Sequence, residues 1–263
     1  MPQFKLNHLL SALRSYFVFD PLIWLWTVFM ATFSLLSSLV DRDGRIQQWF
    51  AVTWSKVILK IIGAPLAVRG MEKIDTTRPH MYALNHLSAL DIPAVYVGMP
   101  CHFRIMAKEE IFRYPFLGWH LRRSGQVSIE REHALASMRS LNRAAAILKG
   151  GQPLVVFPEG GRSATGQVKP FLPGVFYVAI KAGVDIVPMA LVGTYELLPM
   201  ETFHIKPRPL ELLVGEPVSP AGYGPRDMDK LAATVRKAVE DLYYSRAEVP
   251  RKAELQAPRI NAD

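Results

Sequence analysis

Cysteine is almost absent from this sequence of 263 residues, because Cys101 is the only one. The chain therefore has no disulfide framework and no group of cysteines that would bind zinc, and we expect the folded domain to occupy a reducing, intracellular environment. The seven histidines are scattered without the spacing that metal ligands share, so we expect no metal site. No base that would activate Cys101 is evident nearby, which argues against a cysteine nucleophile.

Other patterns are missing as well. The sequence contains no GxSxG turn, which argues against a serine nucleophile and a covalent acyl-enzyme. It contains no internal repeat and no low-complexity tract. Its formal net charge of +8 suits an anionic partner, but no nucleic-acid-binding motif accompanies that charge. We therefore expect an acidic membrane surface or a phosphorylated substrate as partner, and no nucleic acid.

A long uncharged run lies near the amino terminus. Residues 21–40 contain no charged side chain and include four large aromatic residues. As a helix, twenty residues span roughly 30 Å, about the hydrocarbon thickness of a bilayer. A charged turn and a second apolar helix, which carries Lys56 and Lys60, follow this run. We interpret residues 1–62 as a membrane-associated helical segment, either a single span or a hairpin that dips into one leaflet. The alternative is a buried core helix.

From residue 66 onward, short strand patterns alternate with helix patterns. This alternation predicts an α/β domain over residues 63–246, with a largely parallel central sheet flanked by helices. One helix is expected over residues 109–125, and another over 132–149 with an inward face of Leu135, Met138, Leu141, Ala145 and Leu148. The polar stretch 247–263 is predicted to be disordered.

One candidate site is the segment "NHLSALD", which contains His86 and Asp91. A buried-strand pattern, "MYAL", precedes it, and a helix start follows it. A histidine with a nearby carboxylate forms a general base with its orienting partner, because the carboxylate keeps one ring nitrogen protonated and leaves the other to accept a proton. The alternative is a turn histidine beside an aspartate that caps a helix.

A second segment with the same design is "LVVFPEGGRS", Leu154 to Ser163. Here a buried-strand pattern runs into a carboxylate, flexible backbone and a guanidinium, supplied by Glu159, Gly160, Gly161 and Arg162. In open parallel sheets, ligands bind beyond the carboxyl ends of the strands. His86 and Glu159 both lie just past the ends of predicted strands, where this rule expects a ligand to bind.

These segments resemble the motifs of the glycerophospholipid acyltransferase family. The family motif NHxxxxD is complete, and FPEGTRS is matched by "FPEGGRS", with Gly161 in place of threonine. The motif GxxFIDR is matched more loosely by "GQVSIER", where Ser128 and Glu130 replace phenylalanine and aspartate, and a strand with Pro188 matches the fourth motif. The resemblance covers residues 64–216, with the four motifs in the family's order.

The resemblance implies that His86 is the general base, that Asp91 orients it, and that the acceptor hydroxyl attacks an acyl thioester directly. Arg162 and Arg131 match the arginines on the family's phosphate side, and Lys108 is a further basic candidate. The alternatives are a surface salt bridge between Arg162 and Glu159, and a solvated helix start around Arg131.

The remaining predicted substrate-binding residues lie in the second segment. The motif implies a role for Glu159 at the acceptor site, and Gly160 and Gly161 are expected to let backbone N–H groups approach an anion. Ser163 is either a helix cap or a substrate contact. A basic run is either a solvated face or a contact for anionic headgroups or a CoA phosphate; it comprises Arg122, Arg123, Arg139, Arg143 and Lys149.

The expected activity is acyl transfer from a thioester to the hydroxyl of lysophosphatidic acid, giving phosphatidic acid at the cytoplasmic face of the cell membrane. Acyl-CoA or acyl carrier protein would be the donor substrate, and no other cofactor is expected. Another acceptor, such as glycerol-3-phosphate or another lysophospholipid, remains an alternative. So do a thioester hydrolase and a non-catalytic membrane-binding protein, although a protein that only binds has no need of His86 and Asp91.

Overall fold

The computed structural model describes residues 9–41 and 43–251. Its centre is a seven-stranded sheet with the order β1-β7-β6-β2-β5-β3-β4. The strands are β1 (Leu66–Arg69), β2 (Met81–Leu84), β3 (Arg104–Lys108), β4 (Val127–Ile129), β5 (Leu154–Val156), β6 (Ile186–Val192) and β7 (Leu210–Val214).

The strands from β6 to β4 in this order all run in one direction. β2 pairs in parallel with β5 and β6, and β3 pairs in parallel with β5 and β4. β7 is antiparallel to β6, and β1 runs parallel to β7. The predicted largely parallel sheet is confirmed, with a reversed pair of strands at one edge.

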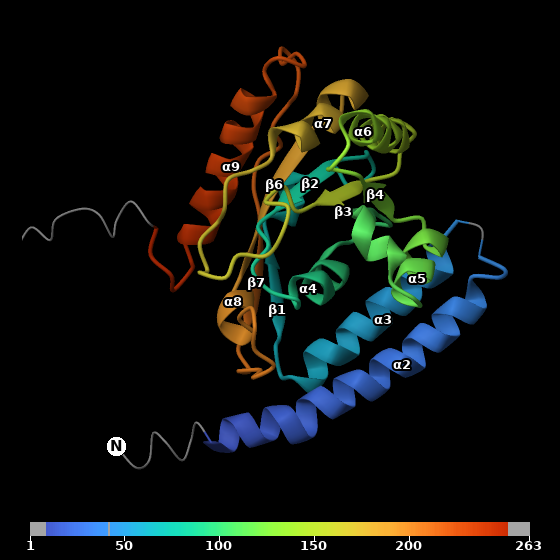
Figure 1. Ribbon diagram of the computed structural model, residues 1–263. Coiled ribbons are helices and arrows are strands. Elements are labelled where there is room, and N and C mark those ends of the chain that lie inside the picture. The colour runs from blue at the N-terminus through green and yellow to red at the C-terminus, as the bar shows by residue number, and fades with distance from the viewer. Residues whose placement is uncertain (1–8, 42, 252–263) are drawn as a thin grey trace, which may run out of the picture.

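Helices cover both faces of the sheet (Figure 1). α6, α7 and α9 lie on one face, and α4 and α3 lie on the other, with α2 outside α3. The helices are α2 (Asp20–Ser37), α3 (Arg45–Ile61), α4 (Asp91–Gly98), α5 (Leu117–Arg123), α6 (Ala134–Lys149), α7 (Tyr177–Ala182), α8 (Thr194–Leu197) and α9 (Met228–Tyr244). A π-helical turn, Ser15–Phe19, precedes α2, and 3-10 turns span Met71–Lys73, Glu109–Arg113 and Pro173–Phe176.

Burial on both faces of the sheet explains why every residue of the central strand β2 is apolar. Met81 and Ala83 belong to the core cluster under α6, α7 and α9, whereas Tyr82 and Leu84 belong to the cluster on the α4 side. All four residues are fully buried. A parallel strand covered on both faces reads as a continuous apolar run, and a strand with one solvated face would alternate.

Two predicted helices differ in the structure. The single helix expected over residues 109–125 is wrong: a 3-10 turn ends at Arg113 and α5 begins at Leu117. Pro115 separates them, because proline lacks an N–H and forces the preceding Tyr114 into an extended conformation. The inward face predicted for residues 132–149 is wrong at its start, where Leu135 and Met138 are exposed. The buried residues of α6 are Ser140, Leu141, Ala144, Ala145 and Leu148.

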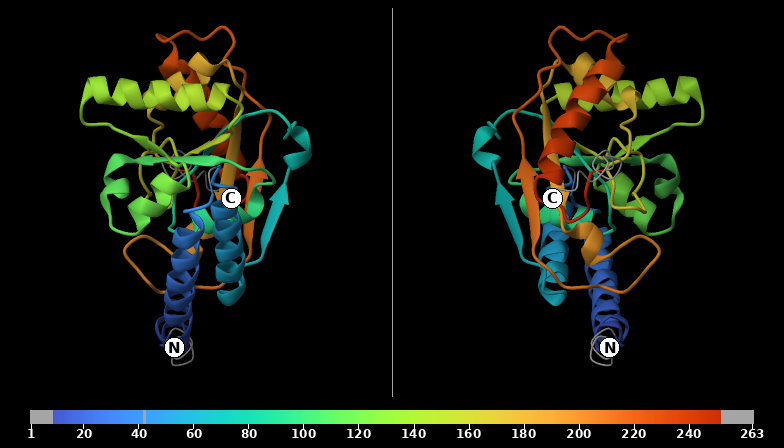
Figure 2. Two further views of the ribbon diagram at one scale, coloured as in Figure 1. Left: turned by 90° about the vertical axis from the view of Figure 1, so that its right-hand side faces the viewer. Right: turned by 90° about the vertical axis from the view of Figure 1, so that its left-hand side faces the viewer.

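The N-terminal helices α2 and α3 lie side by side along one edge of the molecule (Figure 2). The indole N–H of Trp26 donates to the carbonyl of Trp54 (3.2 Å), and the indole of Trp54 donates to the Thr27 hydroxyl (2.9 Å). α3 also packs inward, since Ile58 and Ile62 are buried in the core cluster with α4. The division into a segment 1–62 and a domain 63–246 stays a prediction. Residues 252–263 of the predicted tail lie outside the described residues.

Candidate active site

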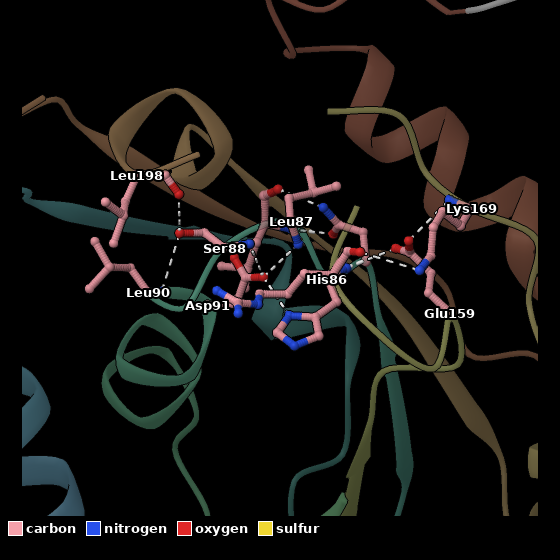
Figure 3. Close-up of polar contacts among 11 residues, drawn as sticks. His86, Leu87, Ser88, Leu90, Asp91, Glu159, Lys169 and Leu198 are labelled. Carbon is pink, nitrogen blue, oxygen red and sulfur yellow. Dashed lines mark hydrogen bonds and ion pairs between the residues drawn. The ribbon is translucent and has the colours of Figure 1, made fainter. Parts of the chain in front are cut away.

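The candidate site lies where the two central strands β2 and β5 end. His86 follows β2 by two residues, and Glu159 follows β5 by three. Because β2 and β5 are neighbouring parallel strands, their carboxyl ends meet at the same edge of the sheet. The backbone N–H of His86 donates to Oε1 of Glu159 at 2.8 Å, so the two segments are in direct contact (Figure 3). His86 and Glu159 therefore meet at one edge of the sheet.

His86 and Asp91 form the arrangement that the spacing predicted. Nδ1 of His86 lies 2.7 Å from Oδ2 of Asp91, and this oxygen also accepts the N–H groups of Leu87 (2.7 Å) and Ser88 (2.9 Å). Asp91 is the first residue of α4, so the positive end of the helix dipole also favours its charge. A carboxylate oxygen only accepts hydrogen bonds, so Nδ1 carries the proton and Nε2 is the ring nitrogen left with a lone pair.

The surroundings of the pair leave one side open. Asp91 is fully buried, whereas 18% of the His86 side chain is exposed. The His86 ring stacks on Phe157, with the ring centroids 4.3 Å apart. Within residues 9–41 and 43–251, no hydrogen bond engages Nε2 of His86. The imidazole is therefore fixed through Nδ1 and through its face, while the nitrogen that would accept a proton has no hydrogen-bond partner among the described residues.

Glu159 positions the backbone of the site. Its Oε1 accepts the N–H of His86, and its Oε2 accepts the N–H of Lys169 at 3.0 Å. The carboxyl group is buried, and this burial raises its pKa to about 7 in spite of the two hydrogen bonds that favour the charged form. Glu159 thus joins the loops after β2 and β5 to the segment that begins at Lys169. The expected alternative, a salt bridge from Glu159 to Arg162, is not among the ion pairs of the described residues.

Glu159→Gln should change how stability depends on pH. The folded state holds the Glu159 proton more tightly than the unfolded chain, since the pKa is about 7 instead of the ordinary 4.5. As pH rises from about 4.5 to 7, the unfolded state ionises first, so the wild type loses up to about 3 kcal/mol of stability that the variant does not lose. Glutamine also lacks a second acceptor oxygen, which costs about 1–3 kcal/mol. Urea unfolding of both proteins at pH 5 and pH 8 measures the change in the free energy of unfolding. An equal change between the two pH values in the wild type and in Glu159→Gln would contradict the prediction.

The glycine-rich turn is built differently from the expected anion cradle. The N–H of Gly160 donates to the carbonyl of Phe157 at 3.0 Å, so this amide closes the turn and does not face a ligand. The carbonyl of Gly160 accepts Nη1 of Arg131 at 3.1 Å. The φ of 76° at position 160 lies in the left-handed region that favours glycine, and a side chain there would also displace the Arg131 guanidinium. The Gly160 N–H thus points into the turn, the Gly161 N–H makes no hydrogen bond within the described residues, and the Gly160 carbonyl brings Arg131 to the site.

The other predicted substrate-binding residues are spread around this turn. Arg162 is exposed, and no hydrogen bond or ion pair in the described part of the chain engages its guanidinium. Lys108 ends β3 and lies 3.8 Å from Glu110, with about half its side chain exposed. Ser163 begins no helix, so the helix-cap alternative is wrong; its N–H donates to the carbonyl of His86, and its hydroxyl lies 3.3 Å from Thr165 Oγ1.

Three residues contribute to the site without having been assigned a role from sequence. The amide of Asn85 exchanges two hydrogen bonds with the backbone of Leu191, and so ties the end of β2 to β6. Phe157 supports the His86 ring, and Lys169 supplies an N–H to Glu159. Asn85 and Phe157 stand inside the motifs, which was the available signal. The contact of Lys169 with Glu159 depends on how the loop folds back, which residue spacing does not specify.

The match to a known protein family covers the segment of the chain that holds the candidate site. Residues 65–192, which contain His86, Asp91 and Glu159, match the family model described as Acyltransferase. The chain is therefore similar to the acyltransferase family over the segment that holds the site. The acyltransferase match begins just before β1 and ends with β6, so it covers the strands that position the site.

The named relatives of this chain share one described activity. The chain is 30% identical to a 1-acyl-sn-glycerol-3-phosphate acyltransferase of Cocos nucifera over 62% of this chain and 53% of the relative. It is 28% identical to one of Chlamydomonas reinhardtii over 89% of this chain and 70% of the relative. The chain thus spans between about half and 70% of the length of these two relatives.

A solved structure with the same architecture is that of the 1-acyl-sn-glycerophosphate (LPA) acyltransferase PlsC from Thermotoga maritima. The TM-score is 0.68 with 29% sequence identity, and the match covers 90% of this chain and 97% of that one. The match extends beyond residues 65–192, because it includes most of the described chain.

Proposed function

We propose that this protein transfers a fatty acyl group from an acyl thioester to the free hydroxyl of lysophosphatidic acid, giving phosphatidic acid. The single observation that carries the proposal is the His86–Asp91 pair between the end of β2 and the start of α4, with Nδ1 of His86 2.7 Å from Asp91 and the His86 side chain 18% exposed. The relatives named above support the acceptor.

The proposed reaction uses His86 as the group that moves the proton. Nε2 removes the proton of the acceptor hydroxyl while its oxygen attacks the thioester carbonyl carbon. The tetrahedral intermediate then collapses, the carbon–sulfur bond breaks, and the imidazolium returns the proton to the leaving thiolate. Asp91 stabilises the transient imidazolium through Nδ1 and does not itself take the proton. The chain's own groups thus account for both proton transfers without a covalent acyl-enzyme.

An acceptor panel tests the proposal. Purified protein is incubated with a labelled acyl thioester and, separately, with lysophosphatidic acid, glycerol-3-phosphate, lysophosphatidylcholine or no acceptor, and the lipid products are identified by mass. Phosphatidic acid formed in preference to the other products is the expected result. Release of free fatty acid at the same rate with and without acceptor would instead identify a thioester hydrolase.

Arg162→Ala should weaken binding of the acceptor phosphate. The Arg162 guanidinium is exposed beside the catalytic turn, and one charge-assisted hydrogen bond contributes about 1.5–3 kcal/mol. We therefore expect the KM for lysophosphatidic acid to rise about 10- to 100-fold, with little change in the KM for the donor. Arg162→Lys should restore only part of this affinity, because lysine lacks the planar fork that binds phosphate.

Arg131→Ala is the matched comparison for this experiment. Since Arg131 holds the carbonyl of Gly160, its loss should lower kcat as well as raise the KM for the acceptor. If Arg162→Ala raises the KM equally for lysophosphatidic acid and for an acceptor without phosphate, Arg162 has a structural role only.

Attachment to a membrane through α2 is part of the proposal. The helix Leu9–Ser37 is long and apolar enough to cross a bilayer, and only 17% of its most apolar window is buried. Both of its ends, however, contact the acyltransferase domain: Ser15 accepts the N–H of Ile205 (2.8 Å), and Ser34 lies 3.1 Å from Nδ1 of His120. A helix that left the domain to cross a bilayer would not make both contacts. These contacts favour a helix that lies in one leaflet, and we place the site at the cytoplasmic face.

Trp24→Glu combined with Leu25→Glu should reduce membrane binding. Both side chains are about 70% exposed on α2, and two carboxylates there would oppose burial in lipid. We expect binding to anionic phospholipid vesicles, measured by co-sedimentation, to fall at least about tenfold. Leu135→Glu, an equally exposed site on α6, is the matched control. Full vesicle binding by the double variant would refute the attachment.

A further inference from the structure

A basic cleft lies beside the candidate active site and takes no part in the chemistry described above. Its volume is about 740 Å³, and it follows the free edge of β4 between α5 and α6. Four arginines line it, against two carboxylates, those of Glu109 and Glu130; the arginines are Arg113, Arg122, Arg139 and Arg143. Such a volume suits one small organic molecule and not an extended protein surface.

The arginines of the cleft are not neutralised by partners. In the part of the chain that the structure describes, none of the four forms an ion pair, and only Arg143 forms a hydrogen bond, to Ser128. Oε1 of Glu130 accepts the N–H groups of Arg131 (2.7 Å) and Glu132 (2.8 Å), and the Glu130 carboxylate, which interacts electrostatically with Arg113, offsets only part of the charge of the four arginines. Four guanidinium groups around one hollow repel one another, and an anion with several phosphates would relieve that repulsion.

Part of the cleft wall is apolar. Phe112, Val127 and Ile147 line it together with the arginines, and Phe112 and Val127 are almost fully buried. A cleft with an apolar wall and a cationic rim matches a molecule that has both a planar ring system and phosphates. Inorganic phosphate would use only the rim.

The cleft is connected to the catalytic edge of the sheet. Glu109 and Glu130 directly follow the carboxyl ends of β3 and β4, and the next residue, Arg131, reaches the turn that carries Glu159. β5 and β3 lie between β2 and β4 in the sheet. At about 4.8 Å between neighbouring strands, β4 is therefore about 14 Å from β2. The phosphopantetheine arm of CoA has about thirteen bonds from phosphorus to sulfur, and at about 3.5 Å for every three bonds it spans about 15 Å.

We propose that this cleft binds the phosphorylated nucleotide end of an acyl-CoA donor, with the pantetheine arm leading along the sheet edge to His86. The proposal rests on the proposed acyl transfer and specifies its donor. The diphosphate and the 3′-phosphate contact the arginines, and the adenine lies on the apolar wall. A lipid headgroup is less suitable, because Arg139 and Arg143 belong to α6, on the opposite face of the sheet from α2 (Figure 1). A membrane surface in contact with α2 does not reach them.

The test begins with direct binding, which does not depend on turnover. Binding of desulfo-CoA to the full chain in detergent is measured by calorimetry for the wild type, Arg113→Glu, Arg139→Glu and Arg139→Gln. Arg113 and Arg139 are exposed and make no side-chain hydrogen bond or ion pair within the described residues, so the folded structure should tolerate these changes. We expect each charge reversal to raise the Kd at least about tenfold, and Arg139→Gln to raise it less. Arg226→Glu, exposed before α9 and far from the cleft, is the control and should bind normally.

Kinetics then show what the cleft recognises. With acyl-CoA, the charge reversals should raise the KM for the donor at least about tenfold and leave the KM for lysophosphatidic acid unchanged. With S-acyl-pantetheine, which lacks the nucleotide, the variants should match the wild type. A wild type that binds desulfo-CoA but transfers no acyl group would leave the cleft assignment in place and refute the proposed function alone.

Three outcomes would overturn the proposal. One is a wild type that does not bind desulfo-CoA, or variants that bind it as tightly as the wild type does. Another is that the variants lose activity with an acyl carrier protein donor but keep it with acyl-CoA, which would make the cleft a contact for that acidic protein. The third is weaker binding to anionic vesicles with unchanged affinity for desulfo-CoA, which would assign the cleft to lipid headgroups.

Discussion

His86→Ala should lower kcat by about 10²- to 10⁴-fold, the range expected when a general base is lost. The change removes the imidazole but keeps both backbone contacts of residue 86, the N–H to Glu159 and the carbonyl that accepts the N–H of Ser163. The fold around the site should therefore survive, and the KM values should change little. Initial rates with a labelled acyl thioester and lysophosphatidic acid measure the loss.

The matched control for this experiment is His133→Ala. His133 is exposed, precedes α6 and makes no side-chain cap hydrogen bond, so its removal should leave the rate unchanged. Thermal unfolding of both variants establishes that they are folded. Near-normal turnover by folded His86→Ala would exclude the mechanism proposed above.

Asp91→Asn should have the second largest effect, with kcat lower by about 10²- to 10³-fold. The asparagine oxygen can still accept hydrogen bonds, but the negative charge that stabilises the imidazolium is gone. In addition, the Oδ1 side of Asp91 is buried and has no hydrogen-bond partner in the described structure, so an NH₂ group placed there would be an unsatisfied donor. Turnover should fall, and the free energy of unfolding should fall by about 1–3 kcal/mol.

A double-mutant cycle separates these two contributions. If Asp91 acts through His86, then Asp91→Asn should cost almost nothing further in kcat once His86 is alanine. The stability loss should persist in the double variant, because the buried amide remains. Losses in kcat that multiply would show that Asp91 contributes to the reaction independently of His86.

The sequence determined the α/β fold and the central pair of residues because both depend on short-range patterns. The four buried residues of β2 predicted a strand covered on both faces, and the five-residue spacing placed Asp91 at the first turn of α4. A strand, a tight turn and a helix start leave little freedom over so few residues. The same reasoning failed for residues 109–125, where Pro115 ended the helix pattern, and for Leu135 and Met138, where α6 extends past the core that covers its later turns.

Only the tertiary structure decided what the remaining residues do, because their contacts are distant in sequence. Glu159 accepts N–H groups from His86 and Lys169, 73 and 10 residues away, and Asn85 bonds Leu191, 106 residues away. The basic run in the sequence divides in the same manner: Arg139 and Arg143 line the cleft, Arg123 lines a second hollow beside α2, and Arg122 lines both. Which charges share a cleft depends on how α5 and α6 pack around the edge of β4, and residue spacing along the chain does not specify that packing.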